Sequence, residues 1–554
     1  MAISYGLTNP AAFKQGISVD SYPDLVKFYA NYPKDTSQSS AADQRHPQLF
    51  TSINNGIDFE NKSISSLNNS FYHINYGGNL YFNSTTGKLE ALGHKSSDSG
   101  YDAYKATANW TSGDNVGIND WELSPYTVPY STTNTPNKEI CRSFNSVLSP
   151  GRYFCIKDGG GYAWNDNPLT TAEWTTTSFN TSSVVYPSDG GFKHLCIDSQ
   201  GSDNILVLFV TNNSNRYIRV NLYDPHTLTL KKDYTTIALN NATRKLADYR
   251  YISVDYLPNV GFLIFYAYQS DPRFQVRILR TYSESTGERL ASDQFVQDSH
   301  GSLNVGDSNN KIIANGCRGW YCPWTKEYFF LPNPYQVFWT KDGINWSSSN
   351  STGLSSSTTC CGFLTDGINM VVSNSASTYM YSNDKGTTWN SGSTLSPDAF
   401  YLWGPNDRMV IPFKCTNNLF KAQPSITLGY WLNDTDGQPT AHLQNFYTND
   451  YIPVNSNTSY IFYGQNKNTK VNTWNNRITW YDSNKNWIST EYNHLKGHIP
   501  ALYTSPSNAA YARLSCRIES GVDVTQQMVN DCNWYFAKDS DFKPMKEFGD
   551  IVFN

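Results

Sequence analysis

The stretch Ser382-Asn383-Asp384-Lys385-Gly386-Thr387-Thr388-Trp389 decides the fold class of this chain. Its residues suit a tight hairpin between two strands. Asp384 is expected to accept hydrogen bonds from backbone N–H groups across the turn, as aspartate does in an Asx-turn. Gly386 supplies a positive φ that a side chain would resist. Trp389 is expected to start the next strand and to bury its ring between neighbouring sheets.

Two weaker copies of this octet lie upstream. One is Thr340-Lys341-Asp342-Gly343-Ile344-Asn345-Trp346, with Asp342 as its acid and Trp346 as its aromatic residue. The other follows Lys157-Asp158-Gly159, with Trp164 as its aromatic residue. Each copy comes after an aromatic or β-branched run. Three copies predict a repeated supersecondary unit, whose tryptophans occupy equivalent places around a common centre.

These hairpins resemble the Asp-box, S-x-D-x-G-x-T-W, found in sialidase-like and related β-propellers. In that family the Asp-boxes lie on the rim of the propeller, away from any chemistry. The resemblance therefore implies structural roles for Asp158, Trp164, Asp342, Trp346, Ser382, Asp384, Gly386 and Trp389.

The composition favours an all-β protein. Charged residues make up 16% of the 554 residues, whereas about 25% is usual for soluble proteins, and aromatic residues reach 15%. Asn, Ser, Thr and Gly carry the polar balance, and these residues suit turns better than long helices. The fold class predicted is a six- or seven-bladed β-propeller, followed by a jelly-roll-like β-sandwich module, with a short N-terminal docking segment.

Several classes of partner and cofactor are not expected. The net charge is −5 and no basic block occurs, so nucleic acid is an unexpected partner. No apolar run approaches the roughly 18 residues of a membrane span. The ten cysteines lie mostly in strand-like runs and are expected to be buried thiols. Neither they nor the nine histidines show metal-ligand spacing. No metal and no cofactor is therefore predicted.

Three regions can be distinguished along the chain. Residues 1–65 contain Asp24-Leu25-Val26-Lys27-Phe28-Tyr29-Ala30, which predicts a helix because Leu25, Phe28 and Tyr29 fall near one helical face. This segment is expected either to dock to a larger assembly or to close the next domain. In residues 66–425 short strands alternate with turns in about seven units, as the blades of a propeller require.

Residues 426–554 form the third region, in which the hairpin octets end. It contains Ile452-Pro453-Val454, then Tyr481-Asp482-Ser483-Asn484-Lys485-Asn486-Trp487-Ile488, then Ser505-Pro506-Ser507-Asn508-Ala509-Ala510-Tyr511-Ala512-Arg513. This succession resembles a carbohydrate-binding-module-like β-sandwich that recurs in phage tail proteins and bacterial surface proteins.

Taken together, the three regions resemble a phage tail-fibre or tailspike receptor-binding protein. The resemblance implies a homo-oligomeric protein of the virion tail that contacts a host surface glycan or glycoprotein and, through its N-terminal segment, other tail proteins. The start, Met1-Ala2-Ile3-Ser4-Tyr5-Gly6-Leu7, lacks the features of a signal peptide. Synthesis in the host cytoplasm and display on the virion after lysis are the expectation.

A glycan-degrading enzyme on the same propeller is the main alternative. A sialidase-like site needs an arginine cluster, a Tyr/Glu pair and an acidic Asp on the propeller axis. Arginines near candidate inner strands are Arg142, Arg152, Arg250, Arg280 and Arg318. The Arg-Ile-Pro signature is absent from the propeller region and no carboxylate stands out, so no catalytic residue is predicted. A structural decoration protein of the virion is the third possibility.

Glycan recognition uses flat aromatic faces together with polar hydrogen-bonding groups. Residues 474–477 are expected to form a loop before the next strand. The predicted glycan-binding residues are Trp474, Asn475, Asn476, Arg477, Trp487 and Tyr492. Trp480 and Tyr481 point to opposite faces of one strand, so at least one of these aromatic rings is expected to be exposed or in a loop.

Overall fold

The computed structural model describes part of the chain. The described residues are 23–31, 48–63, 71–73, 79–83, 88–95, 103–109, 121–126, 140–146, 149–156, 161–165, 175–178, 192–197, 204–210, 218–224, 229–237, 249–268, 273–292, 294–304, 318–322, 324–333, 335–354, 362–373, 379–392, 408–422, 425–466, 474–492, 499–518 and 521–544. Their regular structure is almost entirely β, which confirms the all-β class.

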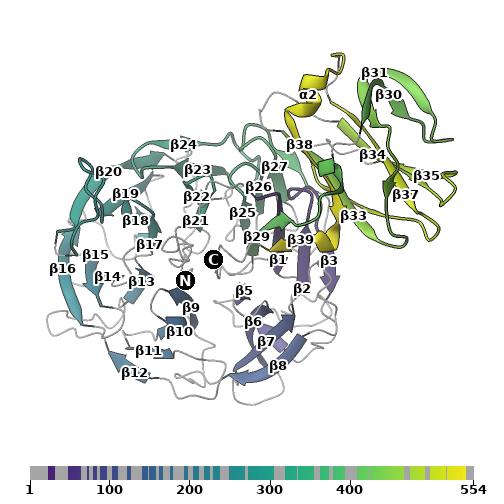
Figure 1. Ribbon diagram of the computed structural model, residues 1–554. Helices are drawn as coiled ribbons and strands as arrows, with labels where there is room; N and C mark the ends of the chain where they lie inside the picture. The colour runs from purple at the N-terminus through teal and green to yellow at the C-terminus, as the bar shows by residue number, and fades with distance from the viewer. Residues whose placement is uncertain are drawn as a thin grey trace.

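Antiparallel sheets follow one another around a ring (Figure 1). The first sheet contains β4 (Phe71–His73), β5 (Asn79–Asn83), β6 (Lys88–Lys95), β7 (Ala103–Asn109) and β8 (Trp121–Tyr126). The second contains β9 (Ile140–Ser146), β10 (Ser149–Ile156), β11 (Gly161–Asn165) and β12 (Thr175–Ser178). The third contains β13 (Phe192–Ile197), β14 (Ile205–Val210), β15 (Ile218–Tyr223) and β16 (Leu230–Ile237).

Three further sheets of four strands continue the ring, each pairing its strands in chain order. They contain β17 (Tyr249–Leu257), β18 (Gly261–Tyr268), β19 (Arg273–Arg280) and β20 (Val296–Asn304); β21 (Arg318–Cys322), β22 (Glu327–Asn333), β23 (Gln336–Thr340) and β24 (Trp346–Ser348); and β25 (Gly362–Thr365), β26 (Met370–Ser373), β27 (Tyr379–Ser382) and β28 (Asn390–Ser391).

The sheet that closes the ring combines both ends of the described chain. Its strand order is β3-β2-β1-β29-β39. The bounds are β1 (Leu25–Asn31), β2 (Gln48–Ser52), β3 (Glu60–Ser63), β29 (Arg408–Cys415) and β39 (Phe542–Pro544). The helix expected over 24–30 is therefore wrong. Strand β1 pairs on both sides, with β2 and with β29, and this pairing outweighs the helical spacing of its apolar residues.

Neighbouring sheets bury their faces against each other, as propeller blades do. Phe265 of β18 stacks on Phe330 of β22, in the next sheet, at 4.2 Å between ring centroids. Val220 of β15 belongs to one apolar cluster with Val254 of β17 and with Phe262 of β18. This packing and the ring seen in Figure 1 make the fold propeller-like.

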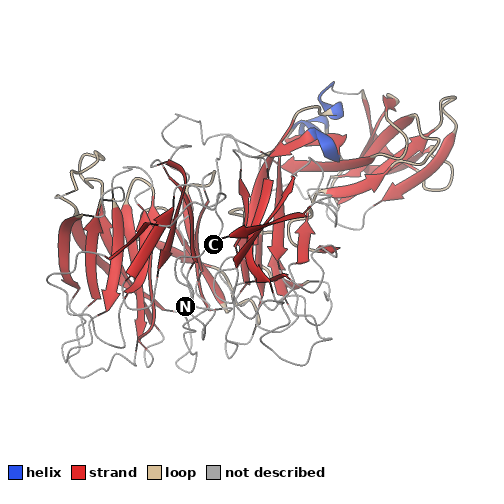
Figure 2. Cartoon of the chain, turned by 90° about the horizontal axis from the view of Figure 1, so that it is seen from below, coloured by secondary structure: helices blue, strands red, loops and turns tan. Residues whose placement is uncertain are grey.

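The region after residue 425 projects from one side of the ring and contains two sheets (Figure 2). The larger sheet has the order β30-β31-β37-β34-β35, with β32 paired to β37, and the smaller has the order β36-β33-β38. The bounds are β30 (Ile426–Leu432), β31 (Pro439–Thr448), β32 (Ile452–Pro453), β33 (Ser459–Asn466), β34 (Trp474–Tyr481), β35 (Trp487–Tyr492), β36 (Ala501–Thr504), β37 (Tyr511–Arg517) and β38 (Cys532–Lys538). We call residues 426–541 the terminal module.

The two sheets of the terminal module share one apolar core. Trp480 of β34 and Phe536 of β38 are fully buried in it. Short helices flank the sheets: η3 (Leu419–Ala422), α2 (Gln526–Asn530) and η4 (Asp539–Asp541). Within the described residues, no helix is both long and apolar enough to span a bilayer.

Candidate functional site

The octet that opened the sequence analysis forms the turn between β27 and β28. Asp384 Oδ1 accepts hydrogen bonds from the Ser382 hydroxyl and from the Thr388 backbone N–H, both at 2.8 Å. Gly386 has a φ of +77°, and its N–H donates to the Ser382 hydroxyl at 2.8 Å. Trp389 is half-buried, and its Nε1 donates at 3.1 Å to the carbonyl of Asn350, which follows β24 of the preceding sheet.

The second copy forms the matching turn between β23 and β24. Asp342 Oδ1 accepts from the Thr340 hydroxyl at 3.0 Å and from the Asn345 N–H at 2.7 Å. The ring of Trp346 packs edge-on against Phe265 of the preceding sheet, at 6.1 Å between centroids. Both turns therefore connect the third and fourth strands of their sheets, and both tryptophans reach the sheet before.

The third copy is not equivalent. Asp158 lies outside the described residues, and so does the side chain of Trp164, whose backbone belongs to β11, the third strand of its sheet. Trp346 instead begins a fourth strand. The stretch at Lys157 consequently connects the second strand to the third. The expectation that the three tryptophans are related by rotation is wrong for Trp164.

A copy that the sequence analysis missed lies between β2 and β3. It reads Ser52-Ile53-Asn54-Asn55-Gly56-Ile57-Asp58-Phe59. Asn54 Oδ1 accepts from the Ser52 hydroxyl at 2.9 Å and from the Asp58 N–H at 3.0 Å, which repeats the bonds of Asp384. Asn in place of Asp and Phe in place of Trp concealed it. The signal was the preserved spacing of Ser52 and Gly56.

The glycines of these turns contact the preceding sheet. A Cβ on Gly343 would lie 2.7 Å from Ile278 Cδ1, and one on Gly386 would lie 2.3 Å from Ser349 Cβ. A Cβ on Gly56 would lie 2.1 Å from Val371 Cγ2. Each turn thus holds one sheet against the sheet before it, which is a structural role.

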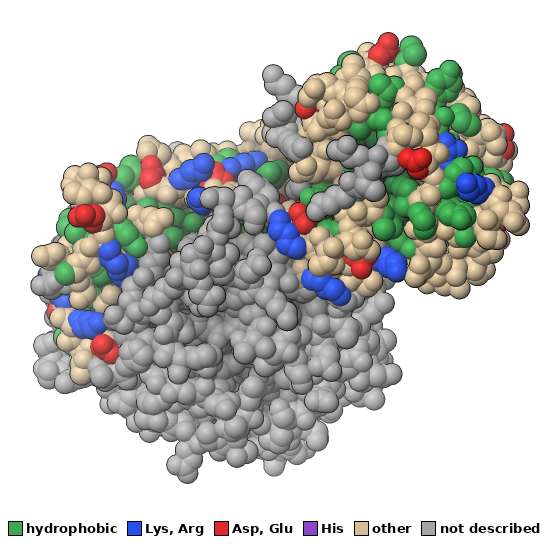
Figure 3. Space-filling model, in the orientation of Figure 1, with side chains coloured by type: hydrophobic (Ala, Val, Ile, Leu, Met, Phe, Trp, Pro, Cys, Tyr) green, Lys and Arg blue, Asp and Glu red, His purple; other side chains and the backbone are tan. Residues whose placement is uncertain are grey.

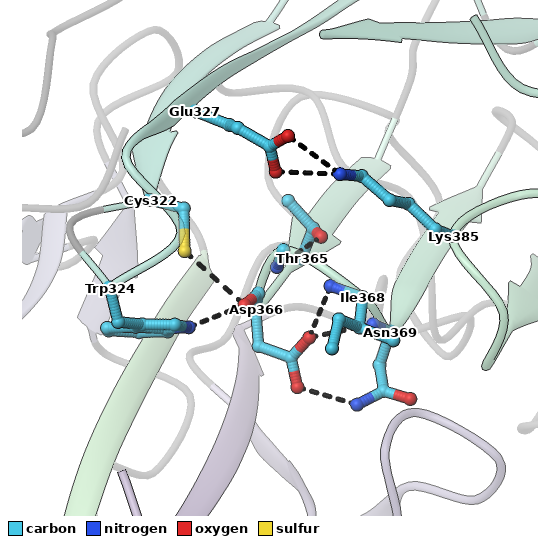
Figure 4. Close-up of polar contacts among 9 residues, drawn as sticks. Cys322, Trp324, Glu327, Thr365, Asp366, Ile368, Asn369 and Lys385 are labelled. Atoms are coloured by element: carbon cyan, nitrogen blue, oxygen red, sulfur yellow. Dashed lines mark hydrogen bonds and ion pairs between the residues drawn. The ribbon is translucent and has the colours of Figure 1, made fainter. Parts of the chain in front are cut away.

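A polar network joins two sheets at the rim where these turns lie (Figure 4). Lys385, in the octet, pairs with both carboxylate oxygens of Glu327 in the preceding sheet, at 2.8 and 2.7 Å. The Asp366 carbonyl accepts from Trp324 Nε1 at 2.6 Å and from Cys322 Sγ at 3.3 Å. These hydrogen bonds and this ion pair run across the junction between the two sheets.

Asp366 and Cys322 are of residue types that serve in catalysis, but their surroundings do not favour such a role. Burial raises the pKa of the Asp366 carboxyl, although hydrogen bonds from Asn369 and Ile368 oppose the shift. Burial also raises the pKa of the Cys322 thiol well above its usual range. A protonated, buried thiol is a poor nucleophile. The role that the contacts support is therefore structural: they hold two sheets together at the rim.

The terminal module brings together a cation and two aromatic rings. The guanidinium of Arg477, on β34, lies 3.6 Å from the ring centroid of Trp431 and 5.0 Å from that of Tyr492. Its Nη1 donates to the Asp434 carboxylate. Burial lowers the pKa of Arg477, although the charge of Asp434 opposes the shift. Such stacking suits a guanidinium, which is planar and weakly hydrated.

The predicted glycan-binding residues divide into two groups. Residues 474–477 belong to strand β34, so the expected loop is wrong. Asn476 faces the core and donates to the Phe462 carbonyl at 3.3 Å, whereas Arg477 faces away from it. The side chains of Trp474 and Asn475 lie outside the described residues.

Trp487 and Tyr492, at the two ends of β35, are 36% and 42% exposed. Trp480 is buried in the core and Tyr481 points to the opposite face, as the strand alternation predicts. Tyr481 is nevertheless only 3% exposed, and its hydroxyl donates to the Gly437 carbonyl, in the turn of the β30–β31 hairpin, at 3.0 Å. The expectation that one ring of this pair is exposed or in a loop is therefore wrong.

The sequence analysis missed Trp431 and Asp434, which lie more than 40 residues before Arg477. The β30–β31 hairpin carries both of them back over β34 and β35. In Figure 3, hydrophobic side chains gather beside Lys and Arg on the visible face of the terminal module. We call Trp431, Asp434, Arg477, Trp487 and Tyr492 the Arg477 cluster.

The arginines considered for a sialidase-like site do not form a described cluster. Arg280 pairs with Glu284 at 3.4 Å. The side chains of Arg142, Arg152, Arg250 and Arg318 lie outside the described residues. Among the side chains that the structure places, no group of three His, Cys, Asp or Glu could hold a metal ion.

Comparison with known proteins gives one sequence relative. No protein family model matches the chain. A 97-residue stretch, 17% of this chain, is 38% identical to a protein named "Tail fiber protein" of Enterococcus phage phiEF24C. That stretch spans only 5% of the relative's length.

Solved structures show weaker likeness. YCF48 bound to D1 peptide has a TM-score of 0.32 and 12% identity, covering 60% of this chain and 88% of that one. BamB from Moraxella catarrhalis has a TM-score of 0.30 and 8% identity, covering 58% and 77%. PorZ of Porphyromonas gingivalis has a TM-score of 0.38 and 11% identity, covering 78% and 58%.

Proposed function

We propose that this chain is a phage tail-fibre protein that attaches the virion to a glycan on the host cell surface. The similarity of 97 residues to a phage tail fibre protein is the observation that carries the proposal. The propeller-like ring serves as a scaffold and the terminal module makes the contact. Several copies of the chain, each with a weak site, would give attachment by avidity.

The Arg477 cluster supports glycan contact through its chemistry. Trp487 and Tyr492 present partly exposed rings, which can stack on the apolar face of a sugar. Arg477 lies beside Tyr492 and can donate hydrogen bonds to sugar oxygens. Strands β1, β2 and β3 belong to the closing sheet of the ring, so docking to other tail proteins would use the surface of that sheet or residues 1–22.

Binding of the purified, fluorescently labelled full chain to host bacteria tests the function. We expect saturable binding that competes with phage adsorption and falls after periodate oxidation of the cell-surface sugars. The W487A/Y492A double variant should bind at least tenfold more weakly, as expected when two stacking rings worth about 1 kcal/mol each are lost. Tyr430→Ala is the matched control, because Tyr430 is also 42% exposed but lies one residue from Trp431, on the opposite face of β30.

Binding that survives periodate would contradict a glycan receptor. Release of reducing sugar from the cells would point to the glycan-degrading alternative. Incorporation into virions without any binding to cells would point to a decoration protein.

A further inference from the structure

The face of the larger sheet that is turned away from the core carries a row of polar side chains. Ser515, on β37, is paired in register with Tyr447 of β31 and with Arg477 of β34. Arg477 is in turn paired with Tyr492 of β35. Directly opposite residues share a face and have Cβ atoms about 5 Å apart. These side chains therefore form a continuous line across four strands.

Three polar atoms on this face have no hydrogen-bond partner in the described part of the chain. They are Asn445 Oδ1, Ser515 Oγ and Arg477 Nε. The three residues are only 4%, 0% and 8% exposed. Buried polar groups are normally paired, because leaving one unpaired costs about 1–3 kcal/mol. Three such atoms on neighbouring strands of one sheet face indicate a site for a polar ligand.

The charge around this row favours an anion. Arg513 lies two residues before Ser515 on the same face, and its Nε donates to the Thr448 carbonyl. Within the described residues Arg513 has no ion pair, and Arg477 pairs only with Asp434. Two guanidinium groups thus lie on this face, that of Arg513 beside Tyr447 and that of Arg477 paired with Asp434. The unpaired Nε of Arg477 leaves one edge of its guanidinium ready for a carboxylate or a phosphate.

The β30–β31 hairpin covers this site. Trp431 stacks on the guanidinium of Arg477, and Asp434, 38% exposed at its side chain, occupies the other edge of that group. The hairpin is held by further single contacts, such as the 3.2 Å bond from the Thr490 hydroxyl to the Asn433 carbonyl. An anionic ligand would compete with Asp434 for Arg477, and its entry requires the hairpin to move outward.

We propose that Asn445, Ser515 and Arg477 together bind an acidic saccharide, a sugar unit that carries a carboxylate or a phosphate. This inference rests on the proposed function and names the ligand class. The anion replaces the Asp434 carboxylate at Arg477 and accepts a hydrogen bond from the Ser515 hydroxyl. A neighbouring sugar hydroxyl donates to Asn445 Oδ1.

Isothermal titration of the full chain with three probes tests the proposal: a trigalacturonate, a glycerol-phosphate oligomer and a neutral galactotriose. We expect one anionic probe to bind at least tenfold more tightly than the neutral one, and the better anion identifies its source. Ser515→Ala and R477Q should each weaken that binding about tenfold or more, since each removes a donor to a charged group. Asp434→Asn should strengthen it, because the competing carboxylate is gone.

Ser515→Ala is informative because it cannot plausibly unfold the module. It removes one unpartnered oxygen from a fully buried position, so the melting temperature should be unchanged or higher. Lys485→Gln is the control for loss of one positive charge on the same module and should change affinity less than twofold. Equal binding by wild type and Ser515→Ala, or tighter binding of galactotriose, overturns the inference, as does binding of none of the probes.

The outcome is separable from the proposed function. If the Ser515→Ala chain attaches to host cells as well as wild type does, this site is wrong and the attachment function stands. If the chain binds an anionic probe through Ser515 but does not attach to cells, the site stands and the attachment function falls.

Discussion

Lys27 and Asp539, separated by 512 positions in the sequence, form an ion pair at 3.0 Å inside the protein. The side chain of Lys27 is fully buried and that of Asp539 is 11% exposed. The ammonium also lies 4.7 Å from the ring centroid of Phe413. The pair joins β1, in the sheet that closes the ring, to the short helix η4 at the end of the terminal module.

Removing one partner of this pair should destabilise the protein by about 3–5 kcal/mol, because the other charge is left buried. We expect K27M to lower the urea midpoint of unfolding clearly. The K27M/D539L double variant should recover much of the loss, since an apolar pair of similar volume can replace a buried ion pair. Lys414→Gln breaks a half-exposed pair with Asp24 and should cost at most about 1 kcal/mol. Equal effects of K27M and K414Q would contradict this account.

The carboxylates of the rim turns predict opposite responses to pH. Burial disfavours ionisation of Asp384, but hydrogen bonds from Thr388 and Ser382 outweigh it, and the pKa lies below its usual value of 3.8. Such a group stabilises the fold above pH 3.8, and this stability is lost as the pH falls through the lowered pKa. D384N should therefore be destabilising at pH 7 and nearly neutral at pH 2–3, as measured by thermal unfolding.

Asp366 should behave in the reverse sense. Burial raises its pKa, so its contribution to stability is fully present below pH 3.8 and is lost as the pH rises through the raised value. D366N mimics the protonated form and should cost less at pH 7 than D384N does. A larger loss for D366N than for D384N at pH 7 would show that the hydrogen bonds of Asp366, rather than its ionisation, dominate.

Alanine substitutions at Gly386 and Gly287 should distinguish the cost of lost packing space from the cost of backbone strain. Both have positive φ, +77° and +68°, so alanine should cost about 1–2 kcal/mol at either. A Cβ at Gly386 would also lie 2.3 Å from Ser349 Cβ, whereas no atom lies within 4 Å of one at Gly287. G386A should thus be more destabilising than G287A by a further 1–3 kcal/mol or so. Equal melting temperatures of the two variants would mean that the octet turn does not hold its sheet against the one before.

The cysteines should differ in reactivity. Cys322 and Cys516 are buried, and burial raises the pKa of both thiols. Cys415 is only partly buried and should be alkylated by iodoacetamide before Cys322 and Cys516 under native conditions, because the thiolate is the reactive form. Mass spectrometry of the peptides would measure this order. Faster labelling of Cys322 or Cys516 would contradict the described burial.

The sequence predicted the hairpins well where their chemistry is local. Ser382, Asp384 and Gly386 lie within five positions, so their hydrogen bonds follow from a short pattern. The copy at Ser52 escaped because its Asn54 replaces the acid while keeping the same acceptor oxygen. The segment at Leu25 was misjudged because its partner strand, β29, lies almost 400 residues away and has no local trace.

The same limit applies to the Arg477 cluster. Alternation along β34 predicted that Trp480 and Tyr481 face apart, and they do. It could not show that the β30–β31 hairpin folds back and covers Tyr481. Trp431 and Asp434 reach Arg477 only through that tertiary contact. When a hairpin brings distant residues together in this way, their positions in the sequence follow no regular spacing that a pattern could detect.

The pairing of β39 with β29 has a consequence for engineering. After leaving the ring at β29, the polypeptide makes the whole terminal module and then returns to lay one more strand on the same sheet. The module is thus an insertion that is connected to the ring by two chain segments, one after β29 and one before β39. Anyone exchanging it for that of another fibre must match both junctions, since a single cut near residue 425 would also remove an edge strand from the closing sheet.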